Sequence, residues 1–132
     1  MPWTINPSHE EIAILMEAAI LSRDMKRFAE AREILKGVRS LVPHSEVPEV
    51  ALGTVAFHEG DFESAAKHYR RALELNPRSA WATVHMGEVS LFQANRLEAR
   101  RYLKAAINLD PRGEHGKLAR ALMEMFADFV NS

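Results

Sequence analysis

The residues that could do chemistry are few and scattered along this chain. The stretch His9-Glu10-Glu11-Ile12-Ala13 begins like a zinc-protease helix, but Ala13 stands where the second histidine is needed. His58 and His85 could approach each other, although a structural or partner-contacting role is favoured over a metal pair. The sequence holds no glycine-rich phosphate loop, no nucleophile elbow and no carboxylate pair with a supporting base. We therefore predict no catalytic residue, no metal site and no cofactor.

The composition excludes several other classes of protein. Cysteine is absent, so there is no disulfide framework and no thiolate nucleophile. Apolar residues make up 47% and charged residues 27%, which is an ordinary globular balance. The N-terminal residues lack the basic and apolar regions of a secretory signal, and the apolar run 12–21 is too short to span a membrane. We expect a cytoplasmic protein that has no membrane partner.

The charge pattern gives no reason to expect nucleic acid as a partner. The net charge is −1, and a basic surface is what would attract a polyanion. The cations Arg70, Arg71, Arg100, Arg101 and Lys104 are interspersed with glutamates along the sequence. We expect them to form a solvated face.

Three prolines mark an internal repeat. Pro43, Pro77 and Pro111 stand 34 residues apart, a period typical of stacked helix pairs. Because proline cannot continue a helical hydrogen-bond ladder, each one ends a pair. Apolar residues recur at helical spacing, and no alternating strand pattern is present. The predicted fold class is all-α, with seven helices at about 10–23, 27–41, 46–59, 62–75, 80–93, 96–109 and 115–129.

Capping and turn residues mark where these helices should begin and end. Ser8 opens a capping box with the glutamate three residues on, and Ser45 and Ser79 are expected to be N-caps. Gly60 should take the positive φ that a helix C-terminus often needs. Asn95 is placed at the equivalent turn of the third pair, because asparagine tolerates this conformation better than most residues.

The second pair carries a pattern of small and aromatic residues at fixed spacing. This pattern resembles the tetratricopeptide repeat (TPR) family through Leu52-Gly53, Gly60, Phe62, Ala65, Tyr69 and Ala72. The third copy keeps Gly87, Ala99, Ala106 and Pro111, has Leu103 where an aromatic is usual, and has Leu97 beside the missing aromatic, whose gap we expect it to fill. The first copy is weakest, because Ala19, Lys26 and Val38 replace family residues. We expect Gly53 and Gly87 to lie where paired helices cross closely.

The resemblance implies a TPR superhelix of three helix-turn-helix repeats and a C-terminal capping helix. It divides the chain into a leader and start of the first helix, three repeats and the cap, at 1–11, 12–45, 46–79, 80–113 and 114–132. The inner wall of such a superhelix is lined by the first helix of each pair. Carried over position by position, the expected partner-binding groove is Met16, Ile20, Val47, Val50, Thr54, Phe57, His58, Trp81, Val84, His85, Glu88, Leu91 and Phe92.

The first helices carry more apolar side chains than the core should be able to bury, so some of these side chains are expected to remain exposed in the groove. An exposed apolar patch of this kind usually marks a binding site, and a groove between helices suits an amphipathic helix or an extended apolar peptide. Family members that clamp a C-terminal carboxylate use lysine and asparagine at the fifth and ninth positions of the first helix. Here those positions hold Met16 and Ile20, Val50 and Thr54, and Val84 and Glu88, so we exclude clamping.

The expected function is a non-enzymatic protein-interaction module. The small single array also resembles the TPR chaperones of bacterial type III secretion systems, which implies a cytoplasmic chaperone for an aggregation-prone export component. One alternative is a self-associating scaffold or adaptor whose groove is filled by a homodimer partner. Another is that the leader, with Trp3 and Ile5, fills the groove. A regulatory domain of a larger enzyme also remains open.

Overall fold

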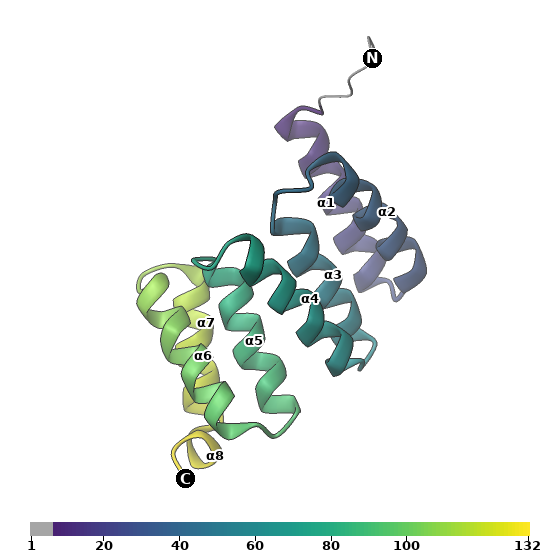
Figure 1. Ribbon diagram of the computed structural model, residues 1–132. Coiled ribbons are helices and arrows are strands. Elements are labelled where there is room, and N and C mark those ends of the chain that lie inside the picture. Colours follow the sequence, from purple (N-terminus) through teal and green to yellow (C-terminus); the bar gives the residue numbers. More distant parts are fainter. Residues whose placement is uncertain (1–6) are drawn as a thin grey trace.

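The computed structural model describes residues 7–132 as an array of antiparallel helices (Figure 1). All its regular elements are helices, in agreement with the predicted all-α class. They are α1 (His9–Asp24), α2 (Phe28–Leu41), α3 (Val47–His58), α4 (Phe62–Leu75), α5 (Ala80–Phe92), α6 (Arg96–Leu109), α7 (Glu114–Met125) and α8 (Ala127–Val130). The prediction that Trp3 and Ile5 of the leader fill the groove concerns residues outside the described part of the chain.

Eight helices are described where seven were predicted. The expected last helix is interrupted at Phe126, which leaves helical geometry at φ −110 and ψ 27. The short α8 that follows packs against α6 and α7, and it buries Val130 to 1% exposure. A break without proline or glycine has no strong sequence signal, so periodicity alone extended the helix through it.

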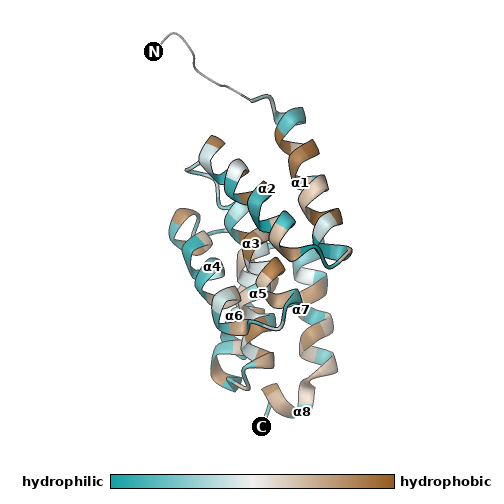
Figure 2. Cartoon of the chain, turned by 90° about the vertical axis from the view of Figure 1, so that its right-hand side faces the viewer, coloured by the Kyte–Doolittle hydropathy of each residue, from teal (hydrophilic) through white to brown (hydrophobic). Residues whose placement is uncertain are grey.

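The helices form two layers. Each helix packs mainly against its neighbours in the chain, and α3 also contacts α1 and α5 while α5 contacts α7. Figure 2 shows α2, α4 and α6 on one side, α1 and α7 on the other, and α3 and α5 between them. Every residue from Pro48 to Ala56 of α3 is buried. The first helices of the second and third pairs therefore form the centre of the molecule.

Glycine lets the paired helices approach closely, as predicted. A Cβ added at Gly53 would lie 2.3 Å from Cε1 of Tyr69, and one added at Gly87 would lie 2.6 Å from Cδ2 of Leu103. Both distances are far below van der Waals contact, so any larger residue would overpack the crossing. The leucine at position 103 occupies the place that Tyr69 holds in the preceding pair.

The turns between paired helices repeat with the 34-residue period. Lys26, Gly60 and Ala94 have φ of 63, 81 and 57. The prediction for Gly60 is confirmed, but the one for Asn95 is wrong, because Asn95 has φ −97 and instead caps α6 by accepting from the Glu98 N–H. The positive φ falls at Ala94, 34 residues after Gly60, so the position within the repeat decides this conformation and the preference of asparagine for positive φ does not.

Two of the three predicted caps are confirmed. Ser8 and Glu11 form both bonds of the capping box, and Ser79 Oγ accepts from the Ala82 N–H at 3.1 Å. Ser45 is not the N-cap of α3, because that helix begins one residue later, after Glu46. The Ser45 hydroxyl still accepts from the Val47 N–H at 3.2 Å.

A buried carboxylate joins the first pair of helices to the second. Glu49 in the first turn of α3 is 4% exposed. Its Oε1 accepts from Arg39 of α2 at 3.2 Å, and its Oε2 lies 3.0 Å from Nδ1 of His68 on α4. A buried charge is costly unless it is paired, so these two partners hold α2, α3 and α4 in one arrangement.

Candidate functional site

The predicted groove residues come from α1, α3 and α5, and they differ widely in exposure. Ile20, His58 and Phe92 are exposed to solvent. Val47, Phe57, Trp81, His85 and Glu88 are half-buried. Met16, Val50, Thr54, Val84 and Leu91 are buried.

The expectation that the apolar groove residues have no core left to enter is wrong for four of them. Val50 belongs to the cluster around Tyr69, and Met16 belongs to the cluster between α1, α2 and α3. Val84 and Leu91 pack with residues of α6 and α7, including Leu122. The reason is geometric, because each first helix packs both on its own partner and on the first helix of the next pair. Its buried face is wider than a two-helix picture predicts.

The apolar residues that remain accessible centre on three aromatic rings. Phe57 at the end of α3 meets Phe92 at the end of α5 edge to face, with ring centroids 5.1 Å apart. Phe62 of α4 lies 5.3 Å from each of them. Phe92 is 53% exposed. We call these three residues the aromatic shelf; sequence reasoning placed Phe62 in the core and did not include it in the site.

A polar centre lies beside the aromatic shelf. The Arg23 guanidinium of α1 donates to the Thr54 hydroxyl of α3 at 3.0 Å, and that hydroxyl donates to the Ala51 carbonyl. On α5, Nδ1 of His85 lies 3.0 Å from the Glu88 carboxylate. These contacts place a cation on α1 and an anion on α5, the first helices on either side of α3, and both groups are largely shielded from water.

Tyr69 connects the polar centre to the interior. Its ring passes over Gly53 and stacks on His85, with centroids 5.6 Å apart and planes at 21°. Burial raises the pKa of the Tyr69 phenol well above its ordinary value; the Glu88 carboxylate raises it further and Arg23 opposes this. The hydroxyl is buried and has no hydrogen-bond partner among residues 7–132. The sequence marked Tyr69 only as core, although its place opposite a helical glycine was the available signal.

The two histidines of the predicted groove each contact an oxygen of their own helix. Nδ1 of His58 lies 2.7 Å from the Thr54 carbonyl oxygen, and Nδ1 of His85 faces Glu88. Within residues 7–132, no three His, Asp or Glu side chains are grouped so as to hold a metal ion. In both rings Nδ1 is therefore already engaged by an oxygen of the same helix.

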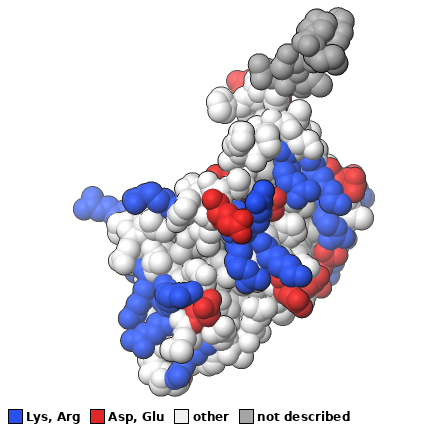
Figure 3. Space-filling view, viewed as in Figure 1, with Lys and Arg blue, Asp and Glu red and all other residues white. Residues whose placement is uncertain are grey.

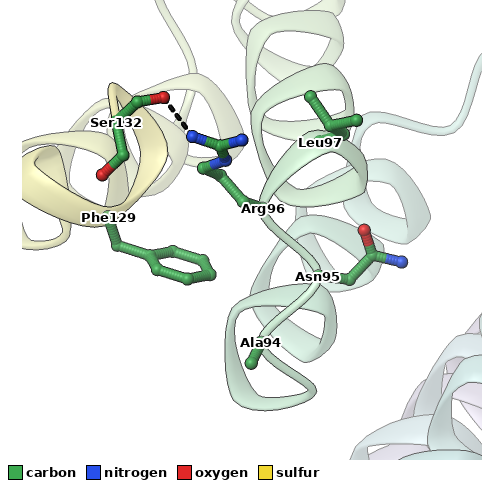
Figure 4. Close-up of a pocket in the computed structure, with 6 residues that line it drawn as sticks. All are labelled: Ala94, Asn95, Arg96, Leu97, Phe129 and Ser132. Atoms are coloured by element: carbon green, nitrogen blue, oxygen red, sulfur yellow. Dashed lines mark hydrogen bonds between the residues drawn. The ribbon is translucent and has the colours of Figure 1, made fainter.

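Two hollows lie mostly outside the predicted groove residues. One of about 720 Å³ is bordered by Ala94, Asn95, Arg96, Leu97, Phe129 and Ser132, between the start of α6 and the end of the described chain after α8 (Figure 4). Another of about 310 Å³, between the start of α1 and the α2–α3 connection, includes Val47 of the predicted set. Leu97 does not fill the place of the missing aromatic, since it is 71% exposed and Arg96 holds the register position instead.

Comparison with known proteins identifies the family. The sequence profile of the tetratricopeptide repeat matches residues 56–124, more than half of the chain. The chain belongs to the tetratricopeptide repeat family. A search of curated protein sequences finds no match. No helix in the described part of this TPR protein is both long and apolar enough to cross a membrane.

Solved structures share the fold at low sequence identity. The first TPR domain of Spaghetti (RPAP3), bound to the HSP90 peptide SRMEEVD, is 16% identical with a TM-score of 0.78, and the match covers 98% of this chain and 100% of that one. The Yersinia enterocolitica type III secretion chaperone SycD, in complex with a peptide of the translocator YopD, is 16% identical with a TM-score of 0.74 and coverage of 94% and 92%. PcrH, in complex with the chaperone binding region of PopD, is 16% identical with a TM-score of 0.77 and coverage of 98% of both chains.

Proposed function

We propose that this TPR protein is a non-catalytic interaction module whose groove on α1, α3 and α5 holds an apolar helical or extended peptide segment. The observation that carries the proposal is the aromatic shelf, where Phe92 leaves more than half of its surface in water beside Phe57. An exposed ring backed by two half-buried rings supplies the apolar anchor that a peptide groove needs. The polar centre next to them supplies hydrogen-bonding groups that would fix the direction of the segment.

Similar structures support the general function, because SycD, PcrH and the Spaghetti domain were each determined with a bound peptide. The narrower function that we propose is a cytoplasmic chaperone for a type III secretion component, by likeness to SycD and PcrH. The mechanism would be sequestration: the groove covers an apolar segment that would otherwise self-associate. In this role the protein should keep a purified export component in solution. The turbidity of that component should therefore be lower with an equimolar amount of the chain than without it.

Binding to the groove is tested with a fluorescent synthetic helix and two matched variants. The probe carries leucine at i, i+3, i+4 and i+7, and a scrambled peptide of the same composition has no such stripe. Phe92→Glu should weaken binding at least tenfold, because it places a charge on the aromatic shelf. Ile14→Glu, at a residue 65% exposed on α1 that is not among the predicted groove residues, makes the same change away from the aromatic shelf and should alter binding less than twofold. Equal binding of the scrambled peptide would contradict the proposal.

A homodimer whose partner fills the groove is the alternative that the same variants address. Light scattering of the wild-type chain gives its mass in solution, and the peptide proposal expects Phe92→Glu to leave that mass unchanged. If the wild type is a dimer and Phe92→Glu makes it a monomer, a self-associating scaffold is the better account. Trp81 is a poorer test residue, because it packs against the core cluster around Tyr69 and a charge there would also cost stability.

A further inference from the structure

The three outer helices do not carry the same charge. α2 and α4 each hold three Lys or Arg residues and two Glu residues. α6 holds four cations, Arg96, Arg100, Arg101 and Lys104, and the single acid Glu98. Figure 3 shows this difference, since blue surrounds a single red group over α6 while the two colours are mixed over the other outer helices. The predicted cations Arg100, Arg101 and Lys104 are solvated as expected, but on α6 a single glutamate accompanies them.

On α4, acids within the helix pair with two of the three cations. Lys67 lies 3.8 Å from Glu63, and Arg71 lies 3.3 Å from Glu74. The positions 34 residues later on α6 hold Leu97 in place of Glu63, Asn108 in place of Glu74 and Ala105 in place of Arg71. Both acids are thus lost on α6 with only one of their two cations, and Arg100 is added where α4 has Ala66.

The cations of α6 consequently form one stripe. Arg96, Arg100 and Lys104 are spaced four residues apart, which places them along one side of the helix, and like charges at this spacing destabilise it. Arg96 donates to the Ser132 carbonyl, and Figure 4 shows it directed to that side. Arg100 and Lys104 are exposed and form no ion pair with any residue of 7–132.

An apolar side chain stands beside these two free cations. Leu97 is 71% exposed, and Figure 4 shows its side chain directed away from that of Arg96. Arg101 completes the surface, held by Glu98 at 3.0 Å and over the Tyr102 ring at 5.1 Å. The face thus combines unpaired positive charge with one leucine.

We propose that the outer face of α6, formed by Leu97, Arg100 and Lys104, binds an acidic amphipathic segment of a partner protein. Charge complementarity selects the partner, because carboxylates one helical turn apart would pair with Arg100 and Lys104, which form no ion pair within residues 7–132. The exposed leucine selects a protein segment over nucleic acid, since a phosphate backbone offers it no apolar contact. Binding to phosphate backbones also calls for more cations than this short stripe holds, and the chain as a whole carries −1.

This surface lies on the outer layer, whereas the proposed groove is built from α1, α3 and α5 on the inner layer (Figure 2). Occupation of one site therefore leaves the other open. The inference does not depend on the groove, and it adds a second, electrostatic contact to the molecule.

The probe for this face is a fluorescein-labelled synthetic helix with Glu at three positions spaced four apart and Leu beside them. A second peptide has Gln for each Glu. Fluorescence anisotropy at 50 mM and 150 mM NaCl is measured for the wild type, for Arg100→Glu/Lys104→Glu, and for Leu97→Asn. The matched control is Lys67→Glu/Arg70→Glu on α4, which changes the net charge by the same amount.

The α6 double reversal should weaken binding of the Glu peptide at least tenfold, and Leu97→Asn should weaken it about threefold without a change in charge. The α4 control should stay within twofold, and the Gln peptide should bind at least tenfold more weakly. An equal loss from the two double reversals would reduce the effect to net charge and overturn the proposal. Tighter binding of a 20-nucleotide poly(dT), or no binding at 50 mM NaCl, would overturn it as well. Melting temperatures show whether each variant is folded.

Discussion

The second and third helix pairs are built on the same plan but differ at the residue that faces the crossing glycine. In α3 and α4, Gly53 lies against the Tyr69 ring, whereas in α5 and α6, Gly87 lies against Leu103. The tyrosine reaches past the crossing to stack on His85, and it brings a hydroxyl into the interior. The leucine fills the same place with carbon alone. The comparison shows that the residue facing the crossing glycine can either fill the crossing with apolar atoms or also reach a side chain of the next first helix.

The largest difference between the two pairs should come from adding a methyl group at each crossing. Gly53→Ala should lower the free energy of unfolding by about 2 kcal/mol, because the buried aromatic ring is rigid and cannot move aside. Gly87→Ala should cost about 1 kcal/mol, since a leucine side chain can adjust more easily. Urea denaturation measures both values.

Gly37 provides the control for these substitutions. It lies in α2 with no atom within 4 Å of an added Cβ. Gly37→Ala should therefore stabilise the protein by about 0.5–1 kcal/mol, the usual preference of a helix for alanine. If Gly53→Ala behaves like Gly37→Ala, the close crossing does not exist in solution.

The next effect concerns the buried hydroxyl of Tyr69, at a position where the third pair has Leu103. Tyr69→Phe should raise the free energy of unfolding by about 1 kcal/mol, because it removes a buried polar group that has no partner. Tyr102→Phe, at a half-buried ring, should change it by less than about 0.5 kcal/mol. A marked loss of stability in Tyr69→Phe would mean that the hydroxyl is hydrogen-bonded in solution, for example to an internal water.

The same tyrosine should make the protein sensitive to alkali. Burial raises its pKa in the folded state, so above about pH 10 the phenol ionises in the unfolded chain but stays protonated in the folded one. Its contribution to stability is therefore complete below pH 10 and falls by about 1.4 kcal/mol per pH unit above it. Thermal melts of wild type and Tyr69→Phe between pH 8 and pH 11 isolate this fall, which the variant should lack.

The smallest effect compares the caps of the two outer helices. Asp61 accepts from the Ser64 N–H at the start of α4, and Asn95 accepts from the Glu98 N–H at the start of α6. The hydrogen bonds to Ser64 lower the pKa of Asp61, so its contribution is present above the unfolded pKa and is lost as the pH falls. Melting at pH 7 and pH 3 should show that Asp61→Asn reduces acid sensitivity, while Asn95→Ala lowers stability equally at both pH values.

The sequence predicted the parts of this fold that depend on local spacing. Proline period, caps at Ser8 and Ser79, and glycine at the crossings are all readable within one repeat. The error at Asn95 arose because residue preference was given more weight than register, which assigned the turn to Ala94. The break at Phe126 has no local signal.

Much less of the candidate site could be predicted. Family positions predict an inner wall on α1, α3 and α5, but they do not say how deep each side chain lies. Val50 and Val84 became core because neighbouring pairs stack, which depends on contacts between residues far apart in sequence. Phe62 and Tyr69 joined the site from the second helix of the pair, where the family pattern expects only packing.

The interior is divided into three clusters, and α3 and α5 each contribute side chains to two of them. The two ends of the described array are therefore connected through α3 and α5. A segment lying along α1, α3 and α5 would contact both of these shared helices at once. Such a ligand would stiffen the curvature of the whole array, even if its own contacts were confined to a few side chains.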